Sequence, residues 1–475
     1  MKKKLLVTSF VLSVTILLVS SAVLAQTTRT TVPGKPPVVR VICEEEVYPS
    51  INPNNGSGPL WCSGSSSIGR IGQTVYATEM ALVADAKPLN NCTWKLLKRD
   101  ANGWSVIHTD VKRTREPSPM AVFPARNEVF VSANPTLVKD MNQYAGPARP
   151  EVIRFASDLK PNTEIPKWQG TPKFSEHSYR SFIADAATNE LLLLNNIGYT
   201  HAEWSLRDAQ GKWSAQGQLT WPIGSDYEKP RPIRLCYPTV ALKNRTCWFC
   251  GVSDIVEPNS QWAAYKRELT KRTWDYDFRR LFFTWSKDIT TNKFEPWLEI
   301  ASCEKTCGWI SQRDLYVAAD QTVFILWSQR DIDTRLREKF FPDAKQANSL
   351  RIAVVRNGKV VSRQIISEVK EGETKPIWQC GRFHATPDGR LWVIAYVSGK
   401  TIENGKSRFV NENRLVEIDS NGVAGPAVTV SIKNPIVSFF TASPRAGSLP
   451  DWRIDLYGSP SIGAGMRYAQ LEIVP

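Results

Sequence analysis

Several residues suited to proton transfer and to anion binding stand where apolar, strand-like stretches of the chain begin. A neutral imidazole can accept or release a proton near pH 7, and a guanidinium can bind a carboxylate or sulfate through paired hydrogen bonds. The histidines that qualify as catalytic candidates are His177 and His384. The candidate substrate-binding residues are Arg180, Arg234, Arg313, Arg382, Tyr179 and Gln379. The alternatives are that the histidines are structural or surface residues and that each arginine pairs with a nearby Asp or Glu.

Carboxylates offer a second possible chemistry, because hydrolysis of a glycosidic bond requires two of them about 5–10 Å apart. Asp254, Glu257, Asp275 and Asp277 all belong to residues 254–280. Two arginines follow directly, at positions 279 and 280. Local ion pairing is therefore the alternative to a catalytic pair.

The cysteines give little support for a metal site. Cys247 and Cys250 have the spacing of half a zinc knuckle, but no second pair follows at a matching spacing. Residues three apart on a strand also point to opposite faces. No glycine-rich phosphate loop or nucleophile elbow is present, so we expect neither a metal nor a cofactor. Nine cysteines leave at least one unpaired within the chain, while Cys303 and Cys307 could form a disulfide.

The elements that must position these residues recur along the chain. Seven hairpin-like stretches combine an apolar run, a short polar turn and an alternating apolar strand. They begin at Ile68, Met120, Ser181, Thr239, Leu315, Phe383 and Phe439. A second hairpin follows most of them, with Asp or Asn and Gly at its turn, and two hairpins make one four-stranded propeller blade. The sequence therefore predicts an all-β, single-domain propeller over residues 26–475, with seven antiparallel blades, or six as the alternative.

The ends and the faces of this ring can also be predicted. The strand-like residues 38–42 are expected to pair with residues 466–473, because closure of the ring removes exposed sheet edges. The long segments 132–150, 254–280, 329–349 and 398–414 should all emerge on one face, and a short helical turn is expected after Ser260. Residues that open the innermost strands would line the channel mouth on that face.

Charge and the first residues of the chain bear on compartment and partners. Lys2, Lys3 and Lys4 precede an apolar run and the small residues up to Ala25, which is typical of a cleaved signal peptide over residues 1–25. We therefore expect an exported protein, periplasmic or extracellular, with no membrane span. The formal net charge of +14 favours acidic partners; a basic surface without a specific partner is the alternative. The basic residues are scattered, so nucleic acid is not expected as a partner, and the protein is expected to be a monomer.

Two turns carry a resemblance to a known family. The segments WKLLKRDANGW from Trp94 and WSLRDAQGKW from Trp204 resemble the Asp-box, or BNR, repeats of the sialidase superfamily. The segments HSYR from His177 and CYPTVAL from Cys236 resemble strand openings in propeller polysaccharide lyases. The resemblance implies that His and Tyr move protons beside a uronate, which adds Tyr237 to the catalytic candidates. It also makes Arg180, Arg313 and Arg382 similar to the arginine triad with which sialidases hold a carboxylate.

Two functional hypotheses follow. The first is a carbohydrate-active enzyme that cleaves an acidic or sulfated polysaccharide by elimination or hydrolysis, as a polysaccharide lyase or a glycoside hydrolase. The second is a non-catalytic propeller that binds a glycan or a protein through the same face.

Overall fold

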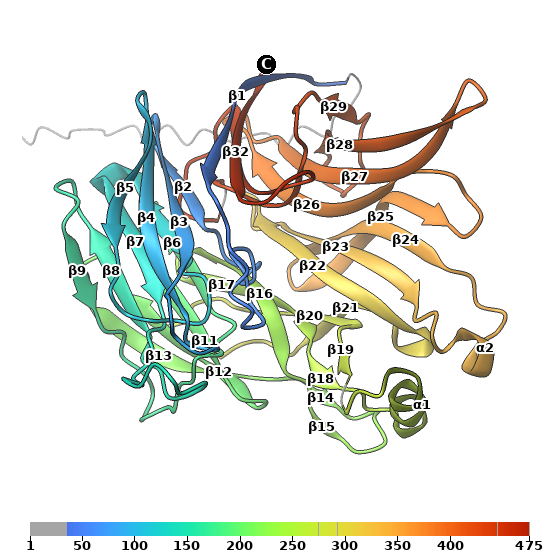
Figure 1. The fold of residues 1–475 in the computed structure, drawn as a ribbon, viewed down its shortest axis with the longest axis horizontal. Coiled ribbons are helices and arrows are strands. Elements are labelled where there is room, and N and C mark those ends of the chain that lie inside the picture. Colours follow the sequence, from blue (N-terminus) through green and yellow to red (C-terminus); the bar gives the residue numbers. More distant parts are fainter. Residues whose placement is uncertain (1–35, 274, 292, 444, 475) are drawn as a thin grey trace, which may run out of the picture.

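Each of the seven predicted hairpins forms the two inner strands of a four-stranded antiparallel sheet. Figure 1 shows the sheets following one another around the molecule in chain order. This computed structural model describes residues 36–273, 275–291, 293–443 and 445–474, so the predicted signal segment 1–25 lies outside the described residues. The protein is an all-β propeller of seven blades, and the six-blade alternative is wrong.

The first three blades follow directly in sequence. Blade 1 contains β2 (Ile68–Ile71), β3 (Thr74–Leu82), β4 (Cys92–Asp100) and β5 (Gly103–Thr109). Blade 2 contains β6 (Met120–Phe123), the 3-10 turn η1 (Pro124–Arg126), β7 (Glu128–Ala133), β8 (Glu151–Phe155) and β9 (Pro161–Glu164). Blade 3 contains β10 (Ser181–Asp185), β11 (Glu190–Ile197), β12 (His201–Arg207) and β13 (Trp213–Thr220).

The remaining blades carry the longer loops. Blade 4 contains β16 (Leu235–Lys243), β17 (Thr246–Ser253), β20 (Arg280–Ser286) and β21 (Leu298–Ser302). Blade 5 contains β22 (Cys307–Val317), β23 (Val323–Ile332), β24 (Ala347–Arg356) and β25 (Lys359–Lys370). Blade 6 contains β26 (Ile377–Ala385), β27 (Leu391–Glu403), β28 (Lys406–Ile418) and β29 (Val428–Val430). Blade 7 contains β30 (Ile436–Thr441), β31 (Arg453–Pro460), β32 (Met466–Val474) and β1 (Val38–Tyr48).

Small elements lie in the connections. Two-stranded ribbons are formed by β14 (Ile223–Gly224) with β15 (Arg231–Pro232), and by β18 (Ile255–Val256) with β19 (Tyr276–Asp277). The helices are α1 (Ser260–Thr270), α2 (Arg337–Phe340) and the 3-10 turn η2 (Glu304–Thr306). The side chain of Asn259 accepts the N–H of Trp262 and caps α1, so the helical turn predicted after Ser260 is present. None of the helices within the described ranges is long and apolar enough to cross a membrane.

Strand β1 closes the ring as the outer strand of blade 7. It pairs antiparallel with β32, from Val38 opposite Val474 to Tyr48 opposite Met466. The predicted pairing of the two chain ends is confirmed. Blades 1 and 7 are further joined by a buried ion pair between Arg70 and Asp455.

Apolar side chains of the alternating strands fill the spaces between blades. Between blades 3 and 4, for example, Leu194 and Trp204 belong to one buried cluster with Val240 and Phe249. Full burial of such a side chain contributes about 1.5–3 kcal/mol. The inter-blade contacts therefore make a rigid frame from which loops can project.

The two faces of the frame differ, as the sequence predicts. The connections between second and third strands, which include α1, α2 and the long β27–β28 hairpin, project on the right of Figure 1 and form the loop-rich face. Most turns on the opposite face are short, although residues 287–297 and 442–452 form longer connections there. At one of them the carboxylate of Asp208 accepts the N–H groups of Gln210 and Lys212 at 3.0 and 2.9 Å, and Gly211 has φ of +83°. This aspartate stabilises a turn.

Two segments fill the central channel. Residues 57–67 cross it on the loop-rich face, and a Cβ at Gly64 would lie 2.0 Å from the backbone oxygen of Pro238. From the opposite face, the turn after β30 sends Arg445 inward. Its guanidinium donates to the backbone oxygen of Gly64 at 2.7 Å and lies 3.2 Å from Asp314. These two segments therefore plug the channel.

Candidate functional site

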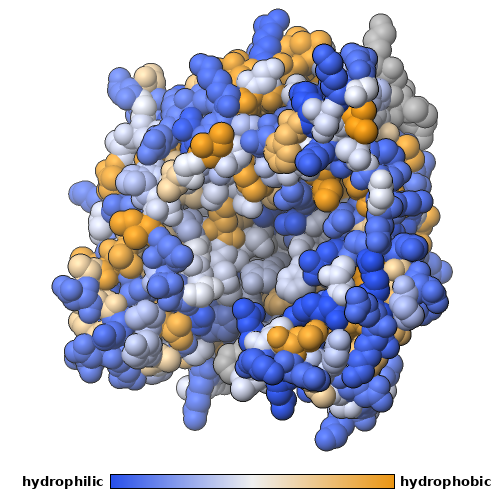
Figure 2. All heavy atoms as spheres, turned by 45° about the vertical axis from the view of Figure 1, so that its right-hand side comes forward, coloured by the Kyte–Doolittle hydropathy of each residue, from blue (hydrophilic) through white to orange (hydrophobic). Residues whose placement is uncertain are grey.

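An aromatic basin surrounds the channel mouth on the loop-rich face. We define the axial basin as Trp61, His177, Tyr179, Tyr237, Phe278 and Trp309. The rings of Trp61 and Tyr179 stack at 4.6 Å, those of Tyr179 and Tyr237 meet edge to face at 5.2 Å, and Phe278 lies 4.6 Å from Trp309. Figure 2, which turns the right side of Figure 1 forward, shows a hollow in this face, rimmed by hydrophilic residues. Trp309 is 40% exposed, so its indole is open to stacking on a ligand ring.

A histidine and a buried carboxylate form the part of the basin best suited to proton transfer. The side chain of His177 is 27% exposed, and its Nδ1 lies 3.2 Å from Oε1 of Glu116, which is fully buried. Burial alone would raise the pKa of Glu116, but the nearby His177, the hydrogen bonds from Ser178 and the charge of Arg180 bring it below its usual range. An ionised Glu116 attracts the imidazole on its Nδ1 side. No described residue hydrogen-bonds Nε2, which is therefore available for proton exchange.

Arg234 and Asp254 form an ion pair beside this histidine. The guanidinium Nη2 of Arg234 lies 2.6 Å from Oδ2 of Asp254, and both side chains are buried. The guanidinium also packs over the ring of Tyr199 at 4.0 Å. Burial raises the pKa of Asp254, although Arg234 and the hydrogen bond from Tyr179 act in the opposite direction. The pair fixes the floor of the basin between blades 3 and 4.

Three candidate residues occupy β-bulges in the innermost strands. The register shifts by an extra residue or more at Tyr237 in β16, at Arg313 in β22 and at Gln379 in β26. A bulge re-aims a side chain relative to the regular alternation. Gln379 donates to the hydroxyl of Ser398 at 2.7 Å, and Nε of Arg313 donates to that of Ser328 at 2.9 Å. Equivalent positions in successive blades thus present polar side chains near the axis.

A cavity of about 130 Å³ opens below the basin between blades 4 and 5. Its walls are formed by Ser63, Tyr237, Val252, Phe278, Trp309, Ile310, Ser311, Gln312 and Arg313. Burial raises the pKa of the Tyr237 phenol, so this hydroxyl keeps its proton at neutral pH. The cavity is therefore lined on one side by apolar groups, and elsewhere by a phenol, two serine hydroxyls and one guanidinium.

Two of the predicted arginines do not reach the basin as free cations. Arg180 is 1% exposed and donates Nη2 to the backbone oxygen of Pro117 at 2.7 Å. Arg382 is 4% exposed and donates to the backbone oxygens of Phe439 and Arg313. Their carbonyl partners hold them between blades. Of the three arginines that were expected to converge on the channel mouth, only Arg313 therefore remains available to a ligand.

His384 lies away from the basin, and its expected position is corrected. Strand β26 begins at Ile377, so His384 stands seven residues along it, or roughly 23 Å at 3.3 Å per residue. Its Nε2 lies 2.7 Å from the backbone oxygen of Asp451, in the connection between β30 and β31, and burial lowers the pKa of the imidazole. These contacts place it toward the face opposite the basin.

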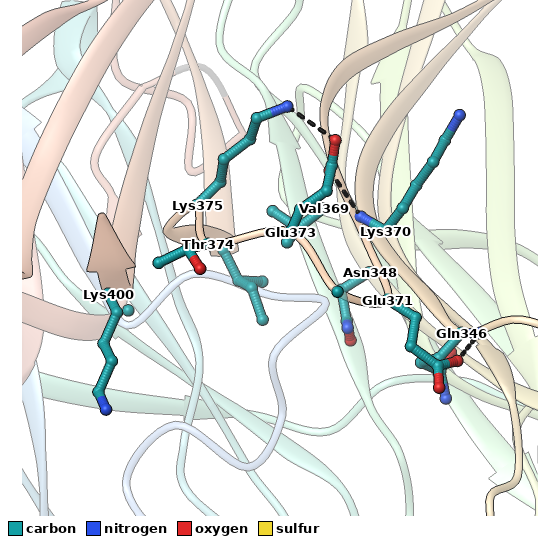
Figure 3. A pocket seen from close by; sticks show the side chains of 12 residues that line it. Gln346, Asn348, Val369, Lys370, Glu371, Glu373, Thr374, Lys375 and Lys400 are labelled. Atoms are coloured by element: carbon teal, nitrogen blue, oxygen red, sulfur yellow. Dashed lines mark hydrogen bonds and ion pairs between the residues drawn. The ribbon is translucent and has the colours of Figure 1, made fainter. Parts of the chain in front are cut away.

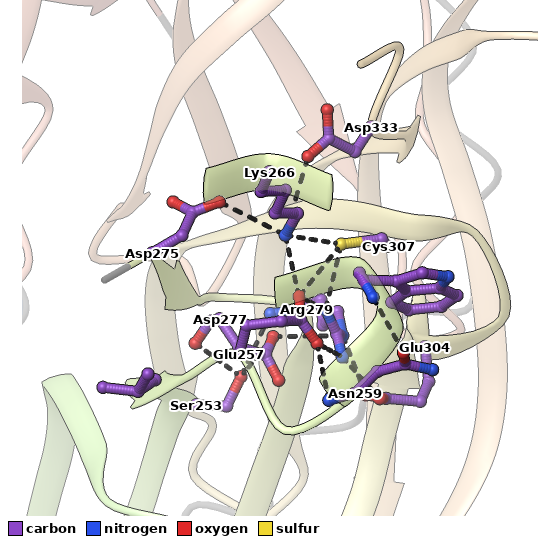
Figure 4. A network of polar contacts seen from close by, with 12 residues as sticks. Ser253, Glu257, Asn259, Lys266, Asp275, Asp277, Arg279, Glu304, Cys307 and Asp333 are labelled. Atoms are coloured by element: carbon purple, nitrogen blue, oxygen red, sulfur yellow. Dashed lines mark hydrogen bonds and ion pairs between the residues drawn. The ribbon is translucent and has the colours of Figure 1, made fainter. Parts of the chain in front are cut away.

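The acidic residues of the blade 4 loop mainly hold α1 in place. Figure 4 shows Lys266 of α1 among carboxylates and the thiol of Cys307. Its Nζ lies 2.7 Å from Glu257, which also binds Arg279 at 2.7 Å. The cations bring the pKa of Glu257 down to about 2 against the effect of burial, whereas burial raises that of Asp277 to about 7. Local ion pairing, the alternative to a catalytic pair of carboxylates, therefore describes the acidic residues of segment 254–280.

The cysteines contribute thiols and no disulfide. All nine are free. Cys307 does not bridge to Cys303; its Sγ lies 3.0 Å from Nζ of Lys266 and 3.0 Å from Nη1 of Arg279. Cys247 and Cys250 are buried in β17. Within the described ranges, no three His, Cys, Asp or Glu residues are grouped as a metal site.

A larger pocket, of about 400 Å³, lies at the rim of the loop-rich face between blades 5 and 6. Lys370, Lys375 and Lys400 line it, and Figure 3 shows Glu373 contacting Lys375 and the backbone of Lys370. Lys375 and Lys370 are paired with Glu373 and Glu368, whereas Lys400 has no ion-pair partner among the described residues.

Some residues of the basin carry little signal in the sequence. Glu116 precedes β6 just as His177 precedes β10, but a carboxylate at a strand opening does not by itself indicate contact with a histidine of the next blade. Trp61 and Phe278 belong to irregular segments, and no periodic pattern marks them as neighbours of the axis.

No known protein family matches this sequence, and no curated protein matches it. Several solved structures are similar in fold. The GH93 α-L-arabinofuranosidase of Fusarium graminearum, in complex with arabinobiose, is 9% identical over 91% of this chain and 98% of its own, with a TM-score of 0.41. A protein of unknown function from Dyadobacter fermentans is 11% identical over 92% and 99%, with a TM-score of 0.39. The sialidase of Trypanosoma rangeli is 9% identical over 89% and 73%, with a TM-score of 0.37.

Proposed function

We propose that this protein is a polysaccharide-cleaving enzyme whose axial basin binds an acidic or sulfated glycan and whose His177 transfers the proton. The observation that supports this most directly is the contact between Nδ1 of the partly exposed His177 and the buried carboxylate of Glu116. A carboxylate that orients imidazole through one nitrogen leaves the other nitrogen as acid or base.

The arrangement favours elimination over hydrolysis. Hydrolysis by the common pair of carboxyl groups needs both of them to reach the bond, but Glu116 contacts His177 and Asp254 is paired with Arg234. In an elimination, Nε2 of His177 would take the proton from the carbon next to a uronate carboxylate. The electron pair would form a carbon–carbon double bond as the adjacent C–O bond breaks. The leaving oxygen would receive a proton from the Tyr237 phenol, whose raised pKa keeps it protonated.

The charge of the chain supports an anionic substrate. The formal net charge is +14, or +11 without the three lysines of the signal segment, and lysines line the rim pocket on the loop-rich face. Such a field increases the rate of encounter with polyanions. We also propose that the N-terminal segment directs export and that the mature chain meets its polymer, as a monomer, in the periplasm or outside the cell.

The test compares native protein with His177→Gln on a panel of uronic acid and sulfated polysaccharides. Elimination generates an ultraviolet-absorbing unsaturated product, whereas hydrolysis generates reducing ends without that absorbance. Removal of a general base should reduce the rate by about 10²- to 10⁴-fold and leave polysaccharide binding in place. His108→Gln, in the outer strand β5, is the matched control and should retain activity.

Two outcomes would contradict the proposal. If His177→Gln cleaves as fast as native protein, the imidazole does not transfer the proton. If native protein binds the polymers but releases neither product, the protein is the non-catalytic glycan-binding module of the second hypothesis.

A further inference from the structure

We propose that the cavity below the axial basin is a subsite for one oxyanionic substituent of the sugar, a carboxylate or a sulfate, and that Arg313 binds it. This inference rests on the proposed function and identifies the class of its substrate. It assigns recognition to a single arginine, in place of a converging triad.

The partners of the arginines around the axis single out Arg313. Arg382 donates to backbone oxygens, Arg234 is paired with Asp254, and Arg445 with Asp314. Arg180 donates Nη2 to a backbone oxygen and its other guanidinium nitrogens have no hydrogen-bond partner among the described residues, but the residue is only 1% exposed, so a ligand cannot reach it. Arg313 uses Nε for the neutral hydroxyl of Ser328. Throughout the described part of the chain, its two terminal nitrogens have neither a hydrogen-bond acceptor nor an ion-pair partner.

The cavity lacks negative charge. Burial lowers the pKa of Arg313, and the neighbouring cation Arg382 lowers it further; the thiol of Cys380 acts in the opposite direction, but no carboxylate does. The adjacent Asp314 contacts Arg445 and accepts the N–H of Phe383 at 2.9 Å. An unpaired cation in a poorly solvated place is costly, and a bound oxyanion would offset that cost through paired, charge-assisted hydrogen bonds.

The shape of the site fits one charged group attached to a ring that stays outside. The cavity holds about 130 Å³ and is bounded by Trp309 and Phe278, whose rings are 4.6 Å apart. The hydroxyls of Ser63 and Ser311 supply further donors beside the guanidinium. A sugar ring stacked on the exposed Trp309 would thus direct a charged substituent inward toward Arg313.

The experiment measures binding of three sugars to the full-length protein by calorimetry or NMR titration: glucuronate, glucose 6-sulfate and glucose. Native protein should bind one or both charged sugars more tightly than glucose. In Arg313→Gln this preference should fall by roughly 10- to 100-fold, the contribution of a charge-assisted pair of hydrogen bonds, while glucose binding is unchanged. Arg363→Gln is the matched control, because Arg363 lies on the outer strand of the same blade and donates to the backbone oxygen of Ile300.

The variants separate this inference from the proposed function. A preference lost for glucuronate alone identifies a carboxylate subsite, and one lost for the sulfated sugar alone identifies a sulfate subsite. If Arg313→Gln keeps the full charged-sugar preference while His177→Gln abolishes cleavage, the inference is wrong and the proposed function stands. If Trp309→Ala binds all three sugars as native protein does, the basin is not the binding site and both are wrong.

Discussion

Replacement of Gly64 by alanine tests whether the channel-crossing segment holds the basin together. A Cβ there would lie 2.0 Å from the oxygen and 2.4 Å from the carbonyl carbon of Pro238, and 2.8 Å from the oxygen of Tyr237. All three are backbone atoms, so no side-chain rotation can relieve the contact. Residues 57–67 must therefore shift by roughly 1 Å or more to restore normal contact distances, and overpacking of this kind costs about 1–3 kcal/mol.

The shift should also disturb the contacts that this segment makes. Trp61 stacks on Tyr179 at 4.6 Å, and the hydroxyl of Ser65 accepts the N–H of Phe182 at 2.9 Å. Partial loss of an aromatic pair and a hydrogen bond adds about 1–2 kcal/mol. We therefore expect Gly64→Ala to lower the free energy of unfolding by about 2–5 kcal/mol and to weaken glycan binding.

The assay is urea unfolding followed by tryptophan fluorescence, together with a polysaccharide binding titration. Gly58→Ala is the matched control in the same segment, because a Cβ there meets nothing within 4 Å. The control should change stability by less than about 0.5 kcal/mol. Equal stability and equal affinity in the two variants would refute the role given to the segment.

Two further predictions concern pH and ring closure. Because burial raises the pKa of Asp277 to about 7, the folded protein keeps a proton that the unfolded chain has lost above about pH 4, and this group's contribution to stability falls as pH rises to 7. Asp277→Asn should remove up to roughly 4 kcal/mol of that decrease. The free energy of unfolding, measured from about pH 4 to about pH 7, should then depend less on pH than in native protein. An equal pH dependence in the two proteins would contradict the burial argument. Deletion of residues 36–48 removes β1 and exposes the backbone edge of β32. Light scattering should then detect association of the protein, and its melting temperature should fall. A monomer with an unchanged melting temperature would show that β1 is dispensable.

Periodic features of the sequence were sufficient to predict the blades. Alternating apolar residues and Asp/Gly turns located both hairpins of most blades, and the need to remove an edge located the partner of residues 38–42. These features depend only on local chain geometry and burial, which a sequence records directly. In a four-stranded meander the loops between second and third strands emerge on one face, so the position of the long segments could also be predicted.

The site could be predicted only in part, because its details depend on contacts between distant segments. His177 and Arg234 were found at strand openings, but nothing local shows that Pro117 and Phe439 offer carbonyls to Arg180 and Arg382. His384 was misplaced because its hairpin pattern begins at Phe383 while the strand starts at Ile377.

The closure of blade 7 by β1 has a consequence for the order of folding. The first described strand pairs with the last, across more than 400 residues of intervening chain. Contacts at such separation form only after a large loss of chain entropy, so β1 waits without its partner until residues 466–474 have been synthesised. A prematurely terminated chain would keep two open sheet edges, one on β1 and one on β31. Only a chain that includes residues 466–474 can therefore cover these edges, and an unfinished chain keeps them exposed to pairing with strands of other molecules.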